Sequence, residues 1–442
     1  MGFDVESSSM TVTELRECRA RLQGYLARVF RDLGRAERRY WARRYVQGLL
    51  LEGGRKTAAG IARRLQESAD AEQALQQLLS QSPWSHEAVR RAVAQQVIPE
   101  LGRERVGWIV DDTGFPKKGA HSVGVARQYS GTLGKVANCQ IGVSLSYATA
   151  DAAIPLDFAL YLPEEWVHDP ARCERAGIPP AARTHRTKWE LALDLIDRAR
   201  AWAVPEGVVV ADAGYGQVQA FRQGLRERNL AYVVGITSTV AVWTTPPDPP
   251  PLPRGGRGRP RKRHWDLPAP QSVQAVAEGL PADTWQRVTW REGTKGPLTS
   301  RFAAVRVQPA HGHTQGEIRE PVQWLLIEWP EGEPAPTKYW LSTLPEQTSL
   351  QDLVWWAKLR WWIEHNDQQL KDELGLDHFE GRSWRGWHPQ VTLTCVAFAF
   401  LVLEMLRNKK NYWVDPPEDA TSGPSLVDQD LGPLPDVLAS LR

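Results

Sequence analysis

The stretch VGWIVDD, residues 106–112, decides the fold that we predict for this chain. Its small and apolar residues predict a short buried strand that ends at Asp111 and Asp112. Residues 137–148 and 154–162 follow as two further predicted strands, with only a short connection between them. Three successive strands so closely spaced predict a meander.

After this meander the sequence alternates between helix and strand patterns. We predict an amphipathic helix over residues 188–202, a buried strand over 207–211 that ends at Asp212, a helix over 218–228 and a strand over 231–236. The resulting order β-β-β-α-β-α-β is typical of an RNase-H-like core in the α/β class.

Helical and β-rich segments flank and interrupt this core. Residues 13–100 carry apolar positions at helical spacing with arginines between them, which predicts a small all-α bundle with a basic face. A Pro/Gly/Arg-rich segment at 246–263 cannot pack, and four apolar stretches near it predict antiparallel strands: 287–290, 302–307, 322–328 and 338–342. Two helices are predicted beyond them, over 350–374 and 391–406.

These patterns predict five segments. We expect a helical DNA-binding domain at 1–100, the first part of the core at 101–236, a β-rich insertion at 237–345, the catalytic helix part of the core at 346–410 and an acidic tail at 411–442.

The net charge of the chain is only +2, from 54 basic and 52 acidic residues, but the charges are unevenly placed. Residues 413–442 hold six acids and one base. Six of the ten residues at 254–263 are basic, namely Arg254, Arg257, Arg259, Arg261, Lys262 and Arg263. Such a basic block on a loop suits contacts with phosphate backbones, so we predict that it binds DNA.

Hydropathy predicts neither a membrane segment nor a secretory signal. The longest apolar run, residues 396–403, is far shorter than the ~20 residues that span a bilayer, and the first thirty residues contain no apolar signal region. The four cysteines lie far apart without a C-x-x-C motif, which predicts neither a zinc site nor a disulfide framework. We therefore expect an intracellular protein with no membrane partner.

Carboxylates stand at the predicted ends of two strands and on one predicted helix: Asp111 and Asp112, Asp212, and Glu364. Carboxylate oxygens are hard ligands that suit Mg²⁺ or Mn²⁺. Two such ions ~3.5–4 Å apart would activate a water or a 3′-hydroxyl for in-line phosphoryl transfer. An isolated acid at a strand end is more often a turn or cap residue, so the prediction depends on the acids acting together.

The predicted helix over 350–374 places Glu364 between two cations. At 100° per residue, Arg360, Glu364 and Lys371 lie within about 40° of one another. The opposite face carries Trp355, Leu359, Trp362 and Leu370. An acid between two cations on a polar stripe suits a metal ligand beside a DNA phosphate, although an ordinary surface ion pair explains the same spacing.

Five segments in a fixed order carry a resemblance to a known family. They are DDTGFPKKG (111–119), ARQYSGTLGKVANCQ (126–140), HRTKWELALDLID (185–197), VVADAGYG (209–216) and LRWWIEHNDQQLKDELGLDHFEGRSWRGWH (359–388). Together they resemble bacterial insertion-sequence transposases of the DDE class, in the group whose third acid lies in a Tyr-Arg-Glu-Lys signature. The resemblance implies an RNase-H-like fold interrupted by a β insertion, two Mg²⁺ ions with Mn²⁺ as a substitute, and cut-and-paste DNA transposition through hairpin ends.

The resemblance also implies roles for individual residues. Carried over by position, the catalytic acids and metal ligands are Asp112, Asp212 and Glu364, and the phosphate-contacting cations are Arg360 and Lys371. Adjacent strand residues point to opposite faces, so Asp111 and Asp112 cannot both face the metals. We choose Asp112, because the family's catalytic acid directly precedes the Thr found here as Thr113.

Two positions need separate comment. Ala357 stands where the signature has a Tyr that contacts phosphate, so this chain lacks that hydrogen bond. Trp340 resembles the Trp that stacks on a flipped base in hairpin-forming members of the family. Packing in the core of the insertion is the alternative, and commoner, role for such a residue.

We therefore predict a DDE transposase that binds double-stranded DNA with terminal inverted repeats, as a homodimer on the DNA, in the bacterial cytoplasm with the nucleoid. Two alternatives stay open at this point. One is a nuclease of the same fold that cleaves without strand transfer, and the other is a catalytically inactive, DNA-binding relative that acts as a repressor.

Overall fold

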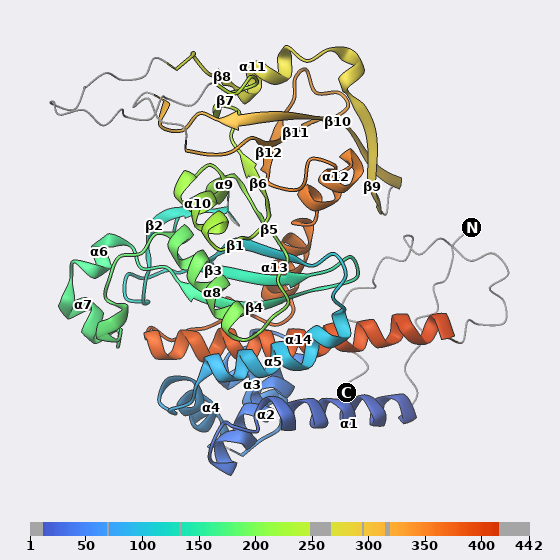
Figure 1. Cartoon of the computed structure of the whole chain (residues 1–442). Coiled ribbons are helices and arrows are strands. Elements are labelled where there is room, and N and C mark those ends of the chain that lie inside the picture. The colour runs from blue at the N-terminus through green and yellow to red at the C-terminus, as the bar shows by residue number, and fades with distance from the viewer. Residues whose placement is uncertain are drawn as a thin grey trace. The chain divides into compact units, whose positions relative to one another are not determined.

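The computed structural model describes residues 12–68, 70–131, 134–247, 267–293, 296–313 and 319–414 (Figure 1). The chain divides into two compact units. Unit 1 contains the described residues up to Pro205 together with residues 361–414, and unit 2 contains Glu206–Arg360. This division does not test the five segments predicted from the sequence, so they stay a prediction.

The described elements of unit 1 before residue 102 are all helices. They are α1 (Val12–Val29), α2 (Ala36–Leu50), α3 (Ala58–Arg64), α4 (Ala71–Ser80) and α5 (His86–Leu101). Their apolar residues recur at three and four positions and are buried, as Leu22, Leu26 and Val29 are in α1. Helices α2 and α5 pack against α14 (Trp384–Val414), so these helices and the C-terminal helix share one core.

Helix α14 is longer than the predicted helix over 391–406, because it begins seven residues earlier and continues through Pro389. Its stretch Trp384–Asn408 is long and apolar enough to cross a membrane, with a mean hydropathy of 1.7. However, 89% of the apolar window is buried inside the protein, which is typical of the core helix of a folded domain.

The sheet of unit 1 is the predicted meander. Its strands are β1 (Gly107–Pro116), β2 (Ala126–Ser130), β3 (Lys135–Ala148) and β4 (Ala153–Leu160). The long central strand β3 pairs antiparallel with β1 along one edge and with β2 and β4 along the other. The short strand β2 was not predicted, because its five residues are exposed at alternate positions and lack an apolar run.

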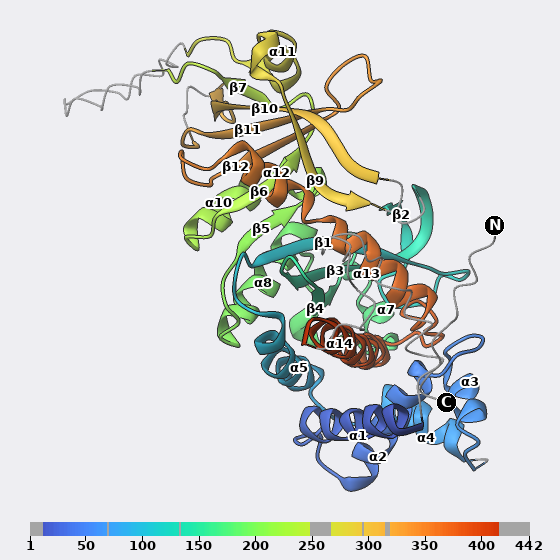
Figure 2. The same cartoon turned by 90° about the vertical axis from the view of Figure 1, so that its right-hand side faces the viewer.

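Helices follow and cover this sheet. They are α6 (Glu164–Val167), α7 (Pro170–Arg175), α8 (Lys188–Ala201) and α13 (Trp361–Asp372). Helix α8, which begins at the predicted residue, packs against β3 and β4, and α13 packs against β1 and β4. Figure 2 shows α8 and α13 on opposite faces of the sheet.

Unit 2 holds a mixed sheet. Its strands are β5 (Val208–Ala211), β6 (Tyr232–Ile236), β7 (Ala241–Trp243), β8 (Gln271–Ser272), β9 (Gln286–Gly293), β10 (Gly296–Pro309), β11 (Gln323–Trp329) and β12 (Lys338–Ser342). The order is β5-β6-β12-β11-β10-β7-β8, with β9 paired to β10. Strands β5 and β6 are parallel, whereas β9 to β12 pair antiparallel at the four stretches predicted to do so.

The helices of unit 2 are α9 (Ala213–Gly216), α10 (Gln219–Glu227), α11 (Val273–Glu278) and α12 (Leu350–Lys358). Helix α10 matches the helix predicted over 218–228, whereas α9 and α11 are too short to have been recognised from periodicity. The mixed α/β architecture of the chain fits the predicted RNase-H-like core.

The prediction of one helix over residues 350–374 is wrong. Helix α12 ends at Lys358, a turn follows at Leu359 and Arg360, and α13 begins at Trp361. Arg360 therefore lies in a turn rather than on the helix that carries Glu364.

Separate anchors explain this break. In unit 2, Lys358 Nζ donates to both carboxylate oxygens of Glu328 at 2.7 Å. In unit 1, Trp362 Nε1 donates to the carbonyl of Thr149 at 3.1 Å. Each half of the predicted helix thus packs on a different core, and such tertiary contacts override helix propensity.

The prediction that the first strand ends at Asp111 and Asp112 is also wrong. The ladder between β1 and β3 continues from Gly107 to Pro116 without a shift in register. Both acids therefore lie in the middle of a strand, where the backbone is held on β3 and only the side chains remain adjustable.

Two neighbouring, buried histidines in unit 1, whose rings are tilted by 33°, make its stability depend on pH. The rings of His86 and His388 lie 4.7 Å apart, and burial lowers the pKa of His86 to about 2 and that of His388 to about 4. An unfolded His titrates near 6.5. Below that pH the two histidines bind protons in the unfolded chain but stay neutral in the folded chain. The two histidines therefore do not lower the free energy of unfolding above pH ~6.5. As the pH falls toward 4, each His lowers it by up to about 1.4 kcal/mol per pH unit.

Urea unfolding of the full chain at pH 7 and at pH 5 measures this effect. We expect the loss of stability between the two pH values to shrink in His388→Gln and to be unchanged in His168→Gln, which alters an exposed histidine. An equal loss in the wild type and in His388→Gln would exclude His388 as a cause.

Candidate active site

Strand β1 presents Asp111 and Asp112 to opposite faces of the unit 1 sheet. Side chains alternate along a strand, and Phe115 packs edge-on against Trp387 of α14 with ring centroids 5.8 Å apart. Asp111 lies four positions before Phe115 and therefore shares the face of α14. Asp112 points to the other face, where its Oδ2 accepts a bond from Lys188 Nζ of α8 at 2.7 Å.

Lys188 is a functional candidate that the sequence analysis missed. It is the first residue of α8, directly after the N-cap Thr187, whose side chain forms a capping box with Glu190. The positive end of a helix disfavours a cation, so a lysine at this position is a local conflict. That conflict, inside the segment HRTKWELALDLID, is the signal that could have identified Lys188.

Helix α13 carries Glu364 and Lys371 of the predicted signature, and the two residues differ in their exposure to solvent. Glu364 lies in its first turn and is exposed, whereas Lys371 is buried with 9% exposure. Asn366 Nδ2 donates to the carbonyl of Ala153 at 3.1 Å and anchors the helix on the sheet. Because α13 and α8 cover opposite faces, the helix of Glu364 lies on the face to which Asp111 points, while the cation contacts Asp112 (Figure 2).

Asp212 directly follows β5 in unit 2, as predicted, and is the N-cap of α9. Its Oδ1 accepts bonds from the backbone N–H groups of Gly214 and Tyr215 at 2.9 and 3.3 Å. Gly235 of β6 keeps this corner tight, because a Cβ there would lie 3.2 Å from the carbonyl carbon of Asp212. One carboxylate oxygen thus serves the cap, and Oδ2 accepts no hydrogen bond from the described residues.

The fit of these residues to a metal ion can be judged from their chemistry. All three predicted ligands are carboxylates, which are the donors that Mg²⁺ and Mn²⁺ prefer. Asp112 already binds a cation, the ammonium of Lys188, as it would bind a metal. Within the described ranges no three His, Cys, Asp or Glu side chains form a metal-binding group. The residues therefore fit a divalent ion individually, and the assembly of Asp112, Asp212 and Glu364 stays a prediction.

Trp340, the candidate for base stacking, lies in the core of unit 2. Its side chain is 9% exposed on β12, which pairs with β11 and β6. Lys358 Nζ lies 5.6 Å from the Trp340 ring centroid and 4.3 Å from that of Trp290. This burial agrees with the core-packing alternative, because a base could stack on Trp340 only after Lys358 had moved.

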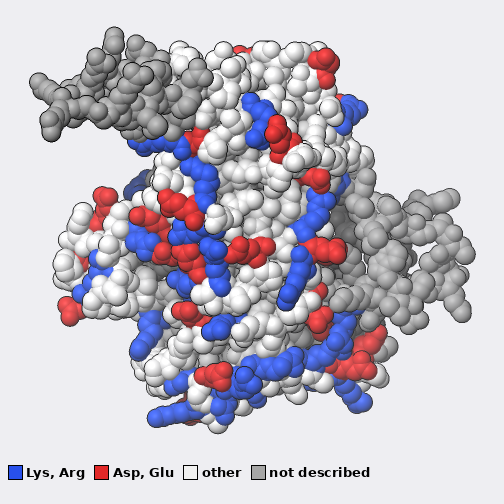
Figure 3. All heavy atoms as spheres, viewed as in Figure 1, with Lys and Arg blue, Asp and Glu red and all other residues white. Residues whose placement is uncertain are grey.

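The basic block at 254–263 lies outside the described residues. On the described surface, Figure 3 shows Lys and Arg side chains gathered in the lower part of the view, over α5 and α1. Arg16, Arg19 and Arg28 of α1 and Arg91 of α5 are exposed. These helices thus carry exposed basic residues of the kind that contact DNA phosphates.

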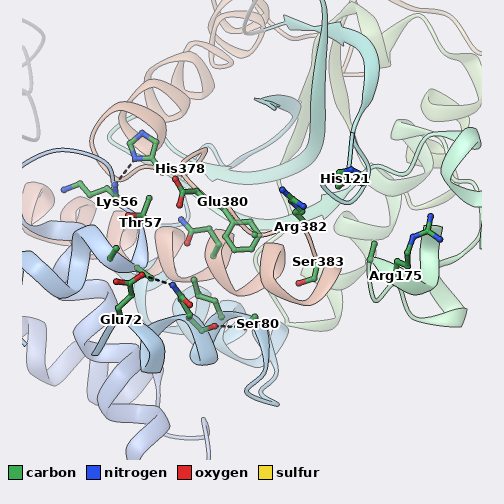
Figure 4. Close-up of a pocket in the computed structure, with 18 of the residues that line it drawn as sticks. Lys56, Thr57, Glu72, Ser80, His121, Arg175, His378, Glu380, Arg382 and Ser383 are labelled. Carbon is green, nitrogen blue, oxygen red and sulfur yellow. Dashed lines mark hydrogen bonds between the residues drawn. The ribbon is translucent and has the colours of Figure 1, made fainter. Parts of the chain in front are cut away.

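A cavity of about 920 Å³ in unit 1 is a second feature that could bind a ligand. Figure 4 shows that it lies among α3, α4 and the segment from His378 to Ser383. Its lining is mixed in charge, with Lys56, Arg175 and Arg382 as well as Glu72 and Glu380. None of the predicted catalytic acids lines it, so the cavity does not coincide with the candidate active site.

Comparison with known proteins adds independent evidence. Residues 28–297 match the family described as DDE superfamily endonuclease. A relative from Microchaete diplosiphon, named as the probable transposase for insertion sequence element IS701, is 26% identical over 333 residues, which are 75% of this chain and 74% of the relative. The family match includes Asp112, Lys188 and Asp212 and ends before Glu364.

Proposed function

This chain belongs to the DDE superfamily of endonucleases, and from that premise we propose that it is the transposase of an insertion sequence. The observation that carries the proposal is Asp112, a half-buried acid held on a rigid strand inside the family match and already paired with a cation. The printed name of the relative from Microchaete diplosiphon supports the same function. A transposase acts on DNA, so we place the protein in the bacterial cytoplasm.

Each residue of the candidate site has a proposed role. Asp112, Asp212 and Glu364 would hold two Mg²⁺ ions, or Mn²⁺ as substitutes, which supply Lewis acidity and an activated water or 3′-hydroxyl. Strand β1 holds Asp112 in position through its ladder with β3, and the cap of α9 orients Asp212. Arg360 and Lys371 would contact DNA phosphates near these acids. Lys371 is buried, so the residues packed around it must move before its ammonium can contact a phosphate.

The finer steps follow from the resemblance and stay proposals. We infer that the enzyme binds terminal inverted repeats as a homodimer, cuts both ends through hairpins and joins them to a target. The direct test is incubation of the purified protein with duplex DNA that carries the element's ends and Mn²⁺. Nicked ends support the proposal. Binding without any cleavage would favour a repressor instead.

The basic block at 254–263 should contribute strongly to DNA affinity. Replacement of Arg254, Arg257, Arg259, Arg261, Lys262 and Arg263 by Gln removes up to six phosphate contacts. We expect the slope of log K against log salt to flatten by up to roughly five units on duplex DNA. A titration between about 50 and 200 mM salt measures this slope, and an unchanged slope would show that the block does not contact DNA.

A further inference from the structure

We propose that Lys188 is a positioning residue that holds the Asp112 carboxylate in the metal-free protein and competes with the divalent ion for it. This inference rests on the proposed function, because it takes Asp112 as a metal ligand. It adds a built-in cation whose displacement sets the affinity of the first metal ion.

The geometry of the pair suits exchange. Lys188 Nζ contacts Oδ2 of Asp112 at 2.7 Å, and no bond to Oδ1 is formed within the described part of the chain. The two side chains are 33% and 19% exposed, so water and ions can reach the contact. A carboxylate that is held through one oxygen, at a site open to solvent, can change partners without unfolding its surroundings.

A second acid on the same sheet shows what a purely structural pair looks like. Asp157 of β4 is fully buried and is held by two arginines, Arg90 and Arg198, with Arg198 Nε at 2.7 Å. Helix α8 supplies both Arg198 and Lys188. Asp157 thus has two cations and no access to solvent, whereas Asp112 has one cation and an open site.

The residue type and the position of Lys188 both favour a cation that a metal ion can displace from Asp112. A lysine ammonium is a compact point charge, as a metal ion is, whereas an arginine would form a planar two-pronged contact that is harder to displace. The capping box fixes where α8 begins and so fixes the Cα of Lys188, while the flexible stem lets the ammonium leave. At the first position of a helix the macrodipole weakens the hold of the protein on this cation.

The consequence is a direct competition. Entry of a divalent ion at Asp112 must break the contact with Lys188, and the ammonium then moves to solvent. Removal of the ammonium should therefore tighten metal binding, although it removes an attractive contact from the metal-free protein. A lysine with a merely structural role would not show this inverse relation.

Titration of the full chain with Mn²⁺, without DNA, tests the inference through the electron spin resonance signal of free Mn²⁺. We expect Lys188→Met to bind the first ion about fivefold more tightly than the wild type, as for the loss of a partly exposed ion pair. Lys188→Arg, which keeps the charge, should bind no more tightly than the wild type. Lys338→Met removes an exposed lysine of unit 2 and should leave the affinity unchanged.

Thermal melting provides the second reading. Without metal, Lys188→Met should melt below the wild type, and saturating Mn²⁺ should raise its melting temperature by more than it raises that of the wild type. If Lys188→Met does not fold, Lys188→Gln replaces it in both measurements. Unchanged or weaker Mn²⁺ binding in the variant that folds would overturn the inference.

Asp112→Asn separates this inference from the proposed function. Loss of the tight Mn²⁺ site in Asp112→Asn, with no gain of affinity in Lys188→Met, would refute the role of Lys188 and leave the metal site in place. Wild-type Mn²⁺ affinity in Asp112→Asn would instead refute Asp112 as a ligand, and with it the proposed site.

Discussion

Alanine in place of Asp112, Asp212 or Glu364 is expected to abolish DNA cleavage and to leave DNA binding nearly unchanged. Phosphoryl transfer depends on the metal ligands, whereas affinity comes mainly from phosphate contacts made elsewhere on the protein. Substitution of residues that only hold a metal ligand in place lowers metal affinity or activity by about 10- to 100-fold. Loss of a ligand itself should therefore lower the cleavage rate by more than about 100-fold. A cleavage gel and a binding titration on the same DNA measure the two quantities.

Asp111→Ala is the matched control, because Asp111 is adjacent in sequence but points to the other face of the sheet. It should cleave better than Asp112→Ala. The opposite order, an active Asp112→Ala and an inactive Asp111→Ala, would assign the first ligand to the face of α13. That outcome has a structural basis, since the helix of Glu364 covers the face of Asp111 (Figure 2).

Trp340→Ala should have the largest effect on stability. Loss of a buried Trp costs about 3–5 kcal/mol, and Trp340 is 9% exposed between two paired strands. We therefore expect a large fall in melting temperature, with nicking and hairpin formation weakened together. Trp340→Phe, which keeps an aromatic ring in the core, should lose less stability.

Base stacking by Trp340 predicts a different result for Trp340→Ala. Stacking is worth roughly 1–3 kcal/mol per base and acts only once a base has been extruded. Trp340→Ala would then melt near the wild type, nick normally and form few hairpins. That pattern would show that Lys358 uncovers the ring when DNA is bound.

Most elements of the fold could be predicted, because apolar residues recur with the period of the structure they form. The strand at 231–236 and the start of α8 at Lys188 agree with the structure to within one residue. The break at Leu359 and Arg360 could not be predicted, since the local pattern continues through it and only distant partners, Glu328 and Thr149, distinguish the two halves.

The candidate site was only partly accessible from sequence. The strand-end position of Asp212 follows from the apolar run before it, and the structure agrees. The pairing of Asp112 with Lys188 joins residues 76 positions apart, and no local pattern encodes such a contact. The burial of Lys371 was likewise unpredictable, because helical periodicity places it on the polar stripe with Glu364.

Strand transfer of a pre-cut end tests the central claim most directly. A labelled duplex that ends in the element's terminal repeat with a free 3′-hydroxyl is incubated with the purified protein, a supercoiled plasmid and Mn²⁺, and the label joined to the plasmid is measured. A transposase is predicted to transfer the label, and Asp112→Ala, Asp212→Ala and Glu364→Ala are predicted to transfer none. Protein that binds the labelled end or nicks the plasmid but joins no label to it would contradict the account.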